Sequence, residues 1–228
     1  MSAETRIMRL NPVKSDTVQE RVYDEILNGI LSGRIRPGEK LTMEGLARTL
    51  NVSLTPVRVA LQKLEAGGFL NIGRNRRIVV TELTKDSLLE IQDIRLLLEC
   101  HAAEIACKNR SEEALTKLEK LNRECNSARN EYAYLEANSA FHGVIYSEAS
   151  MPILEETINS LWQRVSPYLH ILFRGTHDWT DESFSSRHRG ILEAMQKQDP
   201  EAIRYWLAQD LTEAARLIIV RLDELFKR

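Results

Sequence analysis

A short run of residues, Ser53-Leu54-Thr55-Pro56-Val57-Arg58, combines residue types that suit contact with DNA. Small hydroxyl groups and the free amides of a helix N-terminus can bind phosphate, and an arginine one turn further along can reach the edge of a guanine base. Ser53 can cap a helix that starts here. The run therefore predicts a helix that enters the major groove of DNA by its N-terminal end.

Charge is distributed unevenly along the 228 residues, whose net charge at pH 7 is −2. Residues 1–84 hold 13 lysines and arginines against 9 acidic residues, a net charge of +4, whereas residues 85–228 hold 18 against 24, a net charge of −6. Nine of the basic residues lie between positions 33 and 77: Arg34, Arg36, Lys40, Arg48, Arg58, Lys63, Arg74, Arg76 and Arg77. Either a polyanion binds this segment or it is a solvated basic surface, and charge alone does not distinguish the two.

Three helices are predicted in the N-terminal third. Apolar residues recur at helical spacing from Thr17 to Leu31, and Arg36-Pro37-Gly38-Glu39 is a turn signal. Thr42 is a suitable N-cap for a short helix to Leu50. A turn at Asn51-Val52 then leads to the helix Ser53–Glu65, which ends at two glycines. Two short helices joined by a tight turn are typical of a helix-turn-helix.

A β-hairpin is predicted directly after these helices. Phe69–Ile72 and Ile78–Thr81 are rich in strand-forming residues, and they flank Gly73-Arg74-Asn75-Arg76-Arg77. A hairpin with such a cationic tip can lie along a phosphate backbone or in a minor groove.

Residues 17–83 resemble the DNA-binding domain of the GntR family of bacterial transcription regulators. The resemblance is carried by Val52-Ser53-Leu54-Thr55-Pro56-Val57-Arg58-Val59-Ala60-Leu61, by the preceding Pro37-Gly38-Glu39-Lys40-Leu41, and by Gly68-Phe69-Leu70. It implies a winged helix-turn-helix that binds double-stranded operator DNA.

Three positions depart from the pattern of this family. Leu54 stands where the family usually has arginine, Val59 where it usually has glutamate, and Arg77 where the wing usually has glycine. Losing the first arginine should alter base reading, whereas an added arginine on the wing strengthens attraction to any DNA sequence. The residues expected to contact DNA are Arg34, Thr42, Arg48, Ser53, Leu54, Thr55, Arg58, Arg74, Asn75, Arg76 and Arg77.

Strand signals disappear after Thr84, and six helices are predicted. They run over Leu88–Cys107, Ser111–Arg129, Tyr132–Ala149, Pro152–Arg174, Trp179–Gln196 and Asp199–Lys227. Six helices with short connections form a bundle whose interior can hold a site built by several helices. The expected fold is mainly α, with a winged helix-turn-helix in residues 1–83 and an all-α bundle for effector binding and dimerisation in residues 84–228.

Roughly residues 84–222 resemble the ligand-binding FCD domain of the FadR subfamily within GntR. The likeness is carried by Arg95-x-x-x-Glu99, by Phe141-His142, and by His188-x-x-Ile191-Leu192-x-Ala194 followed by Asp199 and Ala202. Many members bind a divalent metal through an aspartate and three histidines. The matching positions here are Asn138, His142, His188 and Asp210.

The resemblance therefore implies a divalent metal ion held by Asn138, His142, His188 and Asp210, and this ligand set suits zinc, nickel or manganese. Asn138 offers only a neutral carbonyl oxygen, so it is expected to be distant or weakly bound, or to face the effector. Polar packing or a metal-free ligand pocket is the alternative. His101, His170 and His177 are expected to be ordinary helix or loop residues.

Arg95 is the expected anchor for a small carboxylate effector, because a guanidinium that faces the interior of a bundle needs an anionic partner. An internal salt bridge to Glu99, four residues further on, is the equal alternative.

The composition excludes several other classes of protein. With 43% hydrophobic and 28% charged residues, the chain is expected to be an ordinary soluble protein. It has no apolar run near the roughly 20 residues that span a bilayer and no secretory signal, so a cytoplasmic location is expected. Cys100, Cys107 and Cys125 have no metal-binding spacing and are expected to pack between helices.

These observations predict a homodimeric transcription regulator, expected to be a repressor, which senses a small organic acid. No phosphate-binding glycine loop or nucleophile motif indicates an enzyme. The competing interpretations are an all-helical metalloenzyme that uses His142, His188 and Asp210 with the basic segment as a DNA tether, and an architectural DNA-binding protein without an effector.

Overall fold

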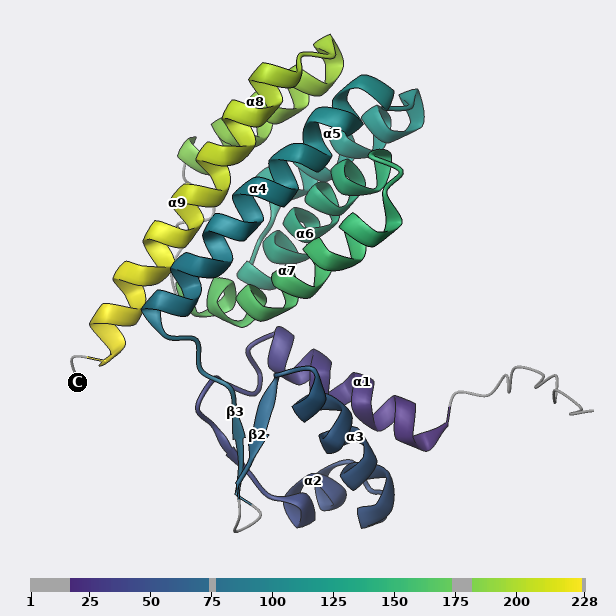
Figure 1. Ribbon diagram of the computed structural model, residues 1–228, viewed down its shortest axis with the longest axis vertical. Helices are drawn as coiled ribbons and strands as arrows, with labels where there is room; N and C mark the ends of the chain where they lie inside the picture. Colours follow the sequence, from purple (N-terminus) through teal and green to yellow (C-terminus); the bar gives the residue numbers. More distant parts are fainter. Residues whose placement is uncertain (1–16, 74–76, 174–181, 227–228) are drawn as a thin grey trace, which may run out of the picture.

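A computed structural model describes residues 17–73, 77–173 and 182–226 of the chain. These residues form a small N-terminal head and a larger helical bundle that lies against one side of it (Figure 1). Among the described residues, none of the helices has the length and hydrophobicity of a transmembrane segment. The fold is the one that the sequence predicts: mainly α, with a winged helix-turn-helix followed by an all-α bundle.

The head contains α1 (Val18–Leu31), α2 (Met43–Thr49) and α3 (Leu54–Ala66). A capping box starts α1, because the Thr17 side chain accepts a hydrogen bond from the Glu20 amide while the Glu20 side chain accepts one from the Thr17 amide. Apolar side chains of all three helices and of the sheet form one buried core, which fixes the orientation of α3.

A three-stranded antiparallel sheet completes the head. It consists of β1 (Lys40–Leu41), β2 (Leu70–Ile72) and β3 (Ile78–Val80) in the order β1-β3-β2. The hairpin of β2 and β3 is the predicted wing, whereas β1 lies where only a turn and a helix start were expected. β1 is only two residues long, and it exists because it pairs with β3, which lies far from it in the sequence. The local sequence pattern cannot predict such a pairing.

Six helices form the described part of the bundle. They are α4 (Lys85–Asn109), α5 (Glu112–Ser127), α6 (Glu131–Glu148), α7 (Pro152–Phe173), α8 (Glu182–Lys197) and α9 (Pro200–Phe226). The predicted helices agree with these to within a few residues at most ends. The expected start of the fifth of them, Trp179, lies outside the described residues.

Side-chain caps mark several of these helix starts, as the sequence predicts. The side chains of Thr84, Ser111 and Asn130 accept hydrogen bonds from backbone amides in the first turns of α4, α5 and α6. Asp199 does the same for the amides of Glu201 and Ala202 in α9.

The three cysteines are buried among packed helices, as predicted. Burial raises the pKa of Cys100 to about 11 and that of Cys125 to about 12, so both remain neutral thiols near pH 7.

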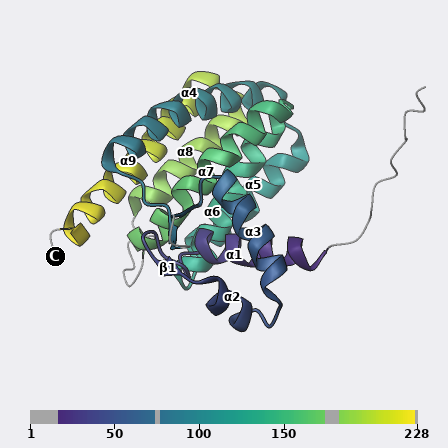
Figure 2. The ribbon, with the colours of Figure 1, turned by 60° about the horizontal axis from the view of Figure 1, so that its bottom comes forward.

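The head and the bundle meet mainly where the end of α1 faces α7 (Figure 2). The Ser166 hydroxyl of α7 donates a hydrogen bond to the Leu31 carbonyl at 3.0 Å. In the connection between the two parts, the Leu83 amide donates to the Tyr168 hydroxyl at 2.5 Å. α7 therefore touches both the end of the first helix and the connecting segment.

Candidate functional site

The predicted DNA-reading surface consists of α2, a tight turn and α3. Asn51 has a φ of 53°, a left-handed backbone conformation that asparagine tolerates better than most residues, and it allows α3 to start three residues later. The Thr42 hydroxyl caps α2 by accepting from the Gly45 amide at 3.1 Å. Ser53 occupies the N-cap of α3 without a side-chain capping bond, so its hydroxyl is not used by its own helix.

One face of α3 is buried and the other is open. Pro56, Val57, Ala60, Leu61 and Leu64 are buried in the core of the head. Ser53, Leu54, Thr55 and Arg58 are exposed, as is Arg48 near the end of α2. These five predicted contact residues therefore lie on exposed positions of the two helices, where they can meet a DNA groove.

Arg77 lies at the base of the wing, next to the start of β3. The Gly73 amide donates to the Arg77 carbonyl at 2.9 Å, which closes the base of the hairpin loop. The Arg77 side chain is exposed. Arg74, Asn75 and Arg76, the other predicted contacts of the wing, lie outside the described residues.

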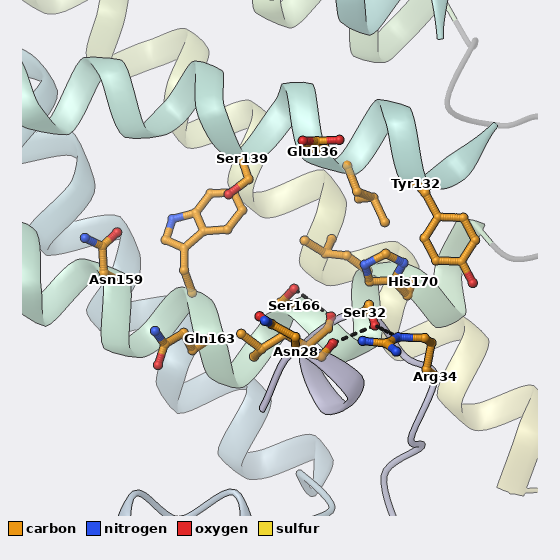
Figure 3. A pocket seen from close by; sticks show the side chains of 14 residues that line it. Asn28, Ser32, Arg34, Tyr132, Glu136, Ser139, Asn159, Gln163, Ser166 and His170 are labelled. Carbon is orange, nitrogen blue, oxygen red and sulfur yellow. Dashed lines mark hydrogen bonds between the residues drawn. The ribbon is translucent and has the colours of Figure 1, made fainter. Parts of the chain in front are cut away.

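Arg34, another predicted contact, is exposed on the side of the head that faces the bundle, and its contact with DNA stays a prediction. Its guanidinium forms a salt bridge with Glu25 at 2.9 Å and donates to the Ser32 hydroxyl. It lines a groove that faces α6 and α7 of the bundle (Figure 3). Its position between α1 and β1 turns it toward the bundle, which local charge counting does not reveal.

Three predicted metal ligands meet inside the bundle although they come from three different helices. His142 of α6, His188 of α8 and Asp210 of α9 are all buried, and each offers one ligand atom such that the three atoms lie within 4.8 Å of one another. His142 Nε2 lies 3.3 Å from one oxygen of Asp210, and Arg187 Nε lies 3.4 Å from the other.

The protonation of this cluster suits cation binding. Burial lowers the pKa of His188 from 6.5 to about 4, so its imidazole is neutral near pH 7. Burial raises the pKa of Asp210, but the hydrogen bond from His142 and the nearby charges outweigh that effect and bring it down to about 2. His188 Nε2 is buried and has no hydrogen-bond partner among the described residues, so one nitrogen is ready to act as a ligand.

Asn138, the fourth predicted ligand, lies one turn before His142 on α6 and is buried. It lines a small cavity of about 20 Å³ together with Arg95 and Asp210. A cavity of this size holds about one water molecule. Asn138 thus lies beside the cluster, where it can face either a metal or a small ligand.

Arg95 forms the salt bridge to Glu99 that was the alternative to an effector contact. Arg95 Nε donates to Glu99 at 2.6 Å, and both residues are buried. The Arg95 guanidinium also lies 4.6 Å from the centre of the Trp162 ring. Because Arg95 still lines the small cavity, its role toward an effector stays a prediction.

Glu99 connects Arg95 to the histidine cluster through residues that the sequence analysis does not single out. The Tyr146 hydroxyl and Trp162 Nε1 both donate to Glu99. The same hydroxyl lies 3.3 Å from His142 Nδ1. Tyr146 stands four residues after His142, so helical spacing could have indicated it, whereas the position of Trp162 depends on how α7 packs.

The remaining histidines differ in their surroundings. His101 is exposed on α4, and His170 lies at the groove between the head and the bundle. His177 lies outside the described residues.

Two sequence families match the two parts of the chain. The family described as bacterial regulatory proteins, gntR family, matches residues 18–80, and the FCD domain family matches residues 90–213. These matches fall within the predicted domains 1–83 and 84–228.

Curated relatives extend the similarity over most of the chain. The HTH-type transcriptional regulator McbR of Escherichia coli (strain K12) is 30% identical over 83% of this chain and 87% of its own length. The HTH-type transcriptional repressor RspR of the same organism is 26% identical over 96% of this chain and 94% of its own length.

Among solved structures, E. coli McbR/YncC superposes with a TM-score of 0.80 at 27% identity and covers 90% of this chain and 99% of its own. These relatives are regulators, so the interpretation as a metalloenzyme is not retained. The chain belongs to the GntR family of bacterial regulatory proteins, carries a C-terminal FCD domain, and is a DNA-binding transcription regulator.

Proposed function

We propose that the protein is a homodimeric repressor whose affinity for a palindromic operator is controlled by a small carboxylate effector and a divalent metal ion in the bundle. The observation that carries the sensing part is the meeting of His142, His188 and Asp210, with His188 Nε2 unpartnered among the described residues. The cytoplasm is the expected location.

The chain's own residues fit such an ion. Two imidazole nitrogens and one carboxylate are a common ligand set for zinc and for related transition metals. A bound ion would supply positive charge that attracts a carboxylate. Tyr146 and Glu99 would hold the His142 ring in place from its other nitrogen, because a ligand histidine is usually fixed by such a hydrogen bond.

Dimerisation is proposed through the bundle. Leu97 on α4 is 69% exposed, and Leu89 and Ile94 on the same helix are also exposed. α9 packs beside α4 and exposes Tyr205 and Val220 (Figure 1). Neighbouring exposed apolar residues often mark an association surface. Two heads in one dimer would read two half-sites and roughly double the specific free energy of binding.

Sedimentation velocity tests the dimer. It is applied to the fragment 84–228 with and without the substitution Leu97→Glu. A dimeric fragment that Leu97→Glu converts to a monomer supports the proposal. A monomeric fragment would contradict dimerisation through the bundle and would indicate an interface in the head.

Fluorescence anisotropy tests the control of DNA binding. The operator is first selected from random-sequence duplexes by the wild-type protein. Its affinity is then measured for chelator-treated protein, for protein reloaded with manganese or zinc, and for reloaded protein with succinate as the probe carboxylate. The proposal expects metal and carboxylate together to change the affinity in the wild type and to have no effect in His188→Ala. An identical response in both proteins would refute it.

A further inference from the structure

The groove between the head and the bundle has the size of a ligand site. Its volume is about 770 Å³, within the range of roughly 300–1,000 Å³ that is usual for small-molecule pockets. The buried cavity beside Asn138 is far smaller, at about 20 Å³. The walls of the groove come from the end of α1 on one side and from α6 and α7 on the other (Figure 3).

Charge is nearly balanced within the groove. Among the described residues that line it, Arg34 and Glu136 are charged, and the Arg34 guanidinium is already paired with Glu25. Burial lowers the pKa of His170 below 6.5, which leaves this imidazole neutral near pH 7. The described lining residues therefore offer no unpaired cation that would select an anionic ligand.

The remaining lining residues combine flat apolar surfaces with neutral polar groups. Trp162, Leu135 and Leu169 provide apolar surface, and the ring of Tyr132 lies 5.3 Å from that of His170, tilted by 40°. Amide and hydroxyl groups also line it: Asn28, Ser32, Ser139, Asn159, Gln163 and Ser166. Aromatic faces with amides and hydroxyls around them can hold a ring compound that carries hydroxyl groups.

One buried atom at the groove lacks a partner. His170 Nδ1 is buried and forms no hydrogen bond with any described residue. Leaving such an atom unsatisfied costs about 1–3 kcal/mol. Reaching this nitrogen from the groove requires the His170 ring to turn, after which a ligand hydroxyl can satisfy it in either tautomer, because a hydroxyl both donates and accepts.

We propose that this groove is a ligand-binding site for an uncharged small molecule with a flat ring and at least one hydroxyl group, held by the aromatic side chains and by a hydrogen bond to His170. The site is separate from the proposed metal cluster. Trp162 and Leu169 form a shared wall, since both also line the cavity beside Asn138. A ligand here would touch the head through Asn28 and Leu31 and would favour the present placement of the head on the bundle.

Titration calorimetry of the full chain with phenol tests this proposal. Phenol has one ring and one hydroxyl and is uncharged at neutral pH, and benzoate serves as the anionic comparison. The wild type is expected to bind phenol and to bind benzoate more weakly. Failure to bind phenol, or equal affinity for benzoate, would overturn the proposal.

Two pairs of variants locate the site. Ser139→Phe places a ring in the groove and should weaken phenol binding at least about tenfold, because the groove is then filled. Ser160→Phe is its control, since Ser160 is exposed on α7 and does not line this groove. His170→Phe keeps a ring but removes the nitrogen and should cost about fivefold in affinity, the value of one hydrogen bond.

His101→Phe, on the exposed face of α4, is the control for His170→Phe and should bind phenol like the wild type. Circular dichroism and thermal unfolding verify that every variant folds. If folded Ser139→Phe binds phenol as the wild type does, the ligand lies elsewhere and the proposal is wrong. Weakening by the control variants to the same extent would contradict it as well.

Discussion

The ring of His142 is held from both sides, with Nε2 at 3.3 Å from Asp210 Oδ2 and Nδ1 at 3.3 Å from the Tyr146 hydroxyl. Asp210 in turn contacts Arg187, and Tyr146 contacts Glu99, so the histidine lies in the middle of a buried polar chain that joins α4, α6, α8 and α9. A buried network of this kind fixes the position of each member. His142 is therefore oriented before any ligand arrives.

Stability of the metal-free protein should fall in mild acid because of His188. Its pKa in the folded protein is about 4, against an ordinary value of 6.5, so the unfolded chain takes up a proton first as the pH falls between these values. The stability lost over this window amounts to about 3 kcal/mol at most. Asp210, with a pKa of about 2 against 3.8, continues the loss at lower pH.

Urea unfolding with a chelator present, at a series of pH values from 7 to 4, measures this effect. His188→Gln should show a weaker pH dependence than the wild type, and His101→Gln should match the wild type because His101 is exposed. Parallel curves for wild type and His188→Gln would show that His188 is not the group that titrates.

Arg58→Ala should reduce specific operator binding. Arg58 is exposed on α3, and the usual family arginine at position 54 is replaced by Leu54, which is itself exposed. If Arg58 contacts a guanine with two hydrogen bonds, its loss costs about 1–3 kcal/mol of specific affinity. Anisotropy titrations of the selected operator and of a scrambled duplex measure the difference. If Arg58→Ala prefers the operator over the scrambled duplex as strongly as the wild type does, Arg58 does not read a base.

Arg77→Ala should weaken binding to every duplex alike. Arg77 is exposed at the base of the wing, where a phosphate contact is expected. Losing it should make the slope of log affinity against log salt concentration less steep, by the amount expected for about one phosphate contact. Titrations of the operator and the scrambled duplex at several salt concentrations check this. A shift in base preference would argue for a base contact instead.

Gly190→Ala should destabilise the packing of α8 against α9. A Cβ atom at Gly190 would overlap the indole ring of Trp206, so the helices would have to separate. We expect a loss of about 2 kcal/mol, as for other overpacked core positions. Gly143→Ala is the matched control, because no atom lies within 4 Å of its Cβ position, and it should stabilise α6 by up to about 1 kcal/mol. Thermal unfolding compares the two, and equal effects would contradict the packing argument.

The sequence predicts the elements of the head well because their signals are local. Thr17, Thr42 and Ser53 stand at helix starts, and apolar residues at helical spacing face one core. β1 escapes prediction because two residues carry too little pattern, and its existence depends on pairing with β3. The ion pair of Arg34 with Glu25 and its place in the groove that faces α6 and α7 likewise depend on packing that the local charge pattern does not contain.

The cluster in the bundle required a family resemblance, because its three members lie on three helices and no local spacing joins them. The resemblance brought together His142, His188 and Asp210, and the structure places these three side chains within reach of one ion. Of the partners that orient them, Tyr146 is one helical turn from His142 and could have been indicated by spacing, whereas the contact of Arg187 with Asp210 follows from packing. The choice between an effector contact and a salt bridge for Arg95 likewise needed the position of Glu99 in space.

Metal content is the most direct test of the sensor. Inductively coupled plasma mass spectrometry is applied to wild-type protein purified without chelators or an affinity tag, and to His188→Ala, Asp210→Asn and the control His101→Ala, all verified as folded. We predict about one divalent ion per chain in the wild type and in His101→Ala, and almost none in the other two variants. A substoichiometric mixture of metals in the wild type, or equal content in His188→Ala, would contradict the account and leave a metal-free pocket beside Arg95.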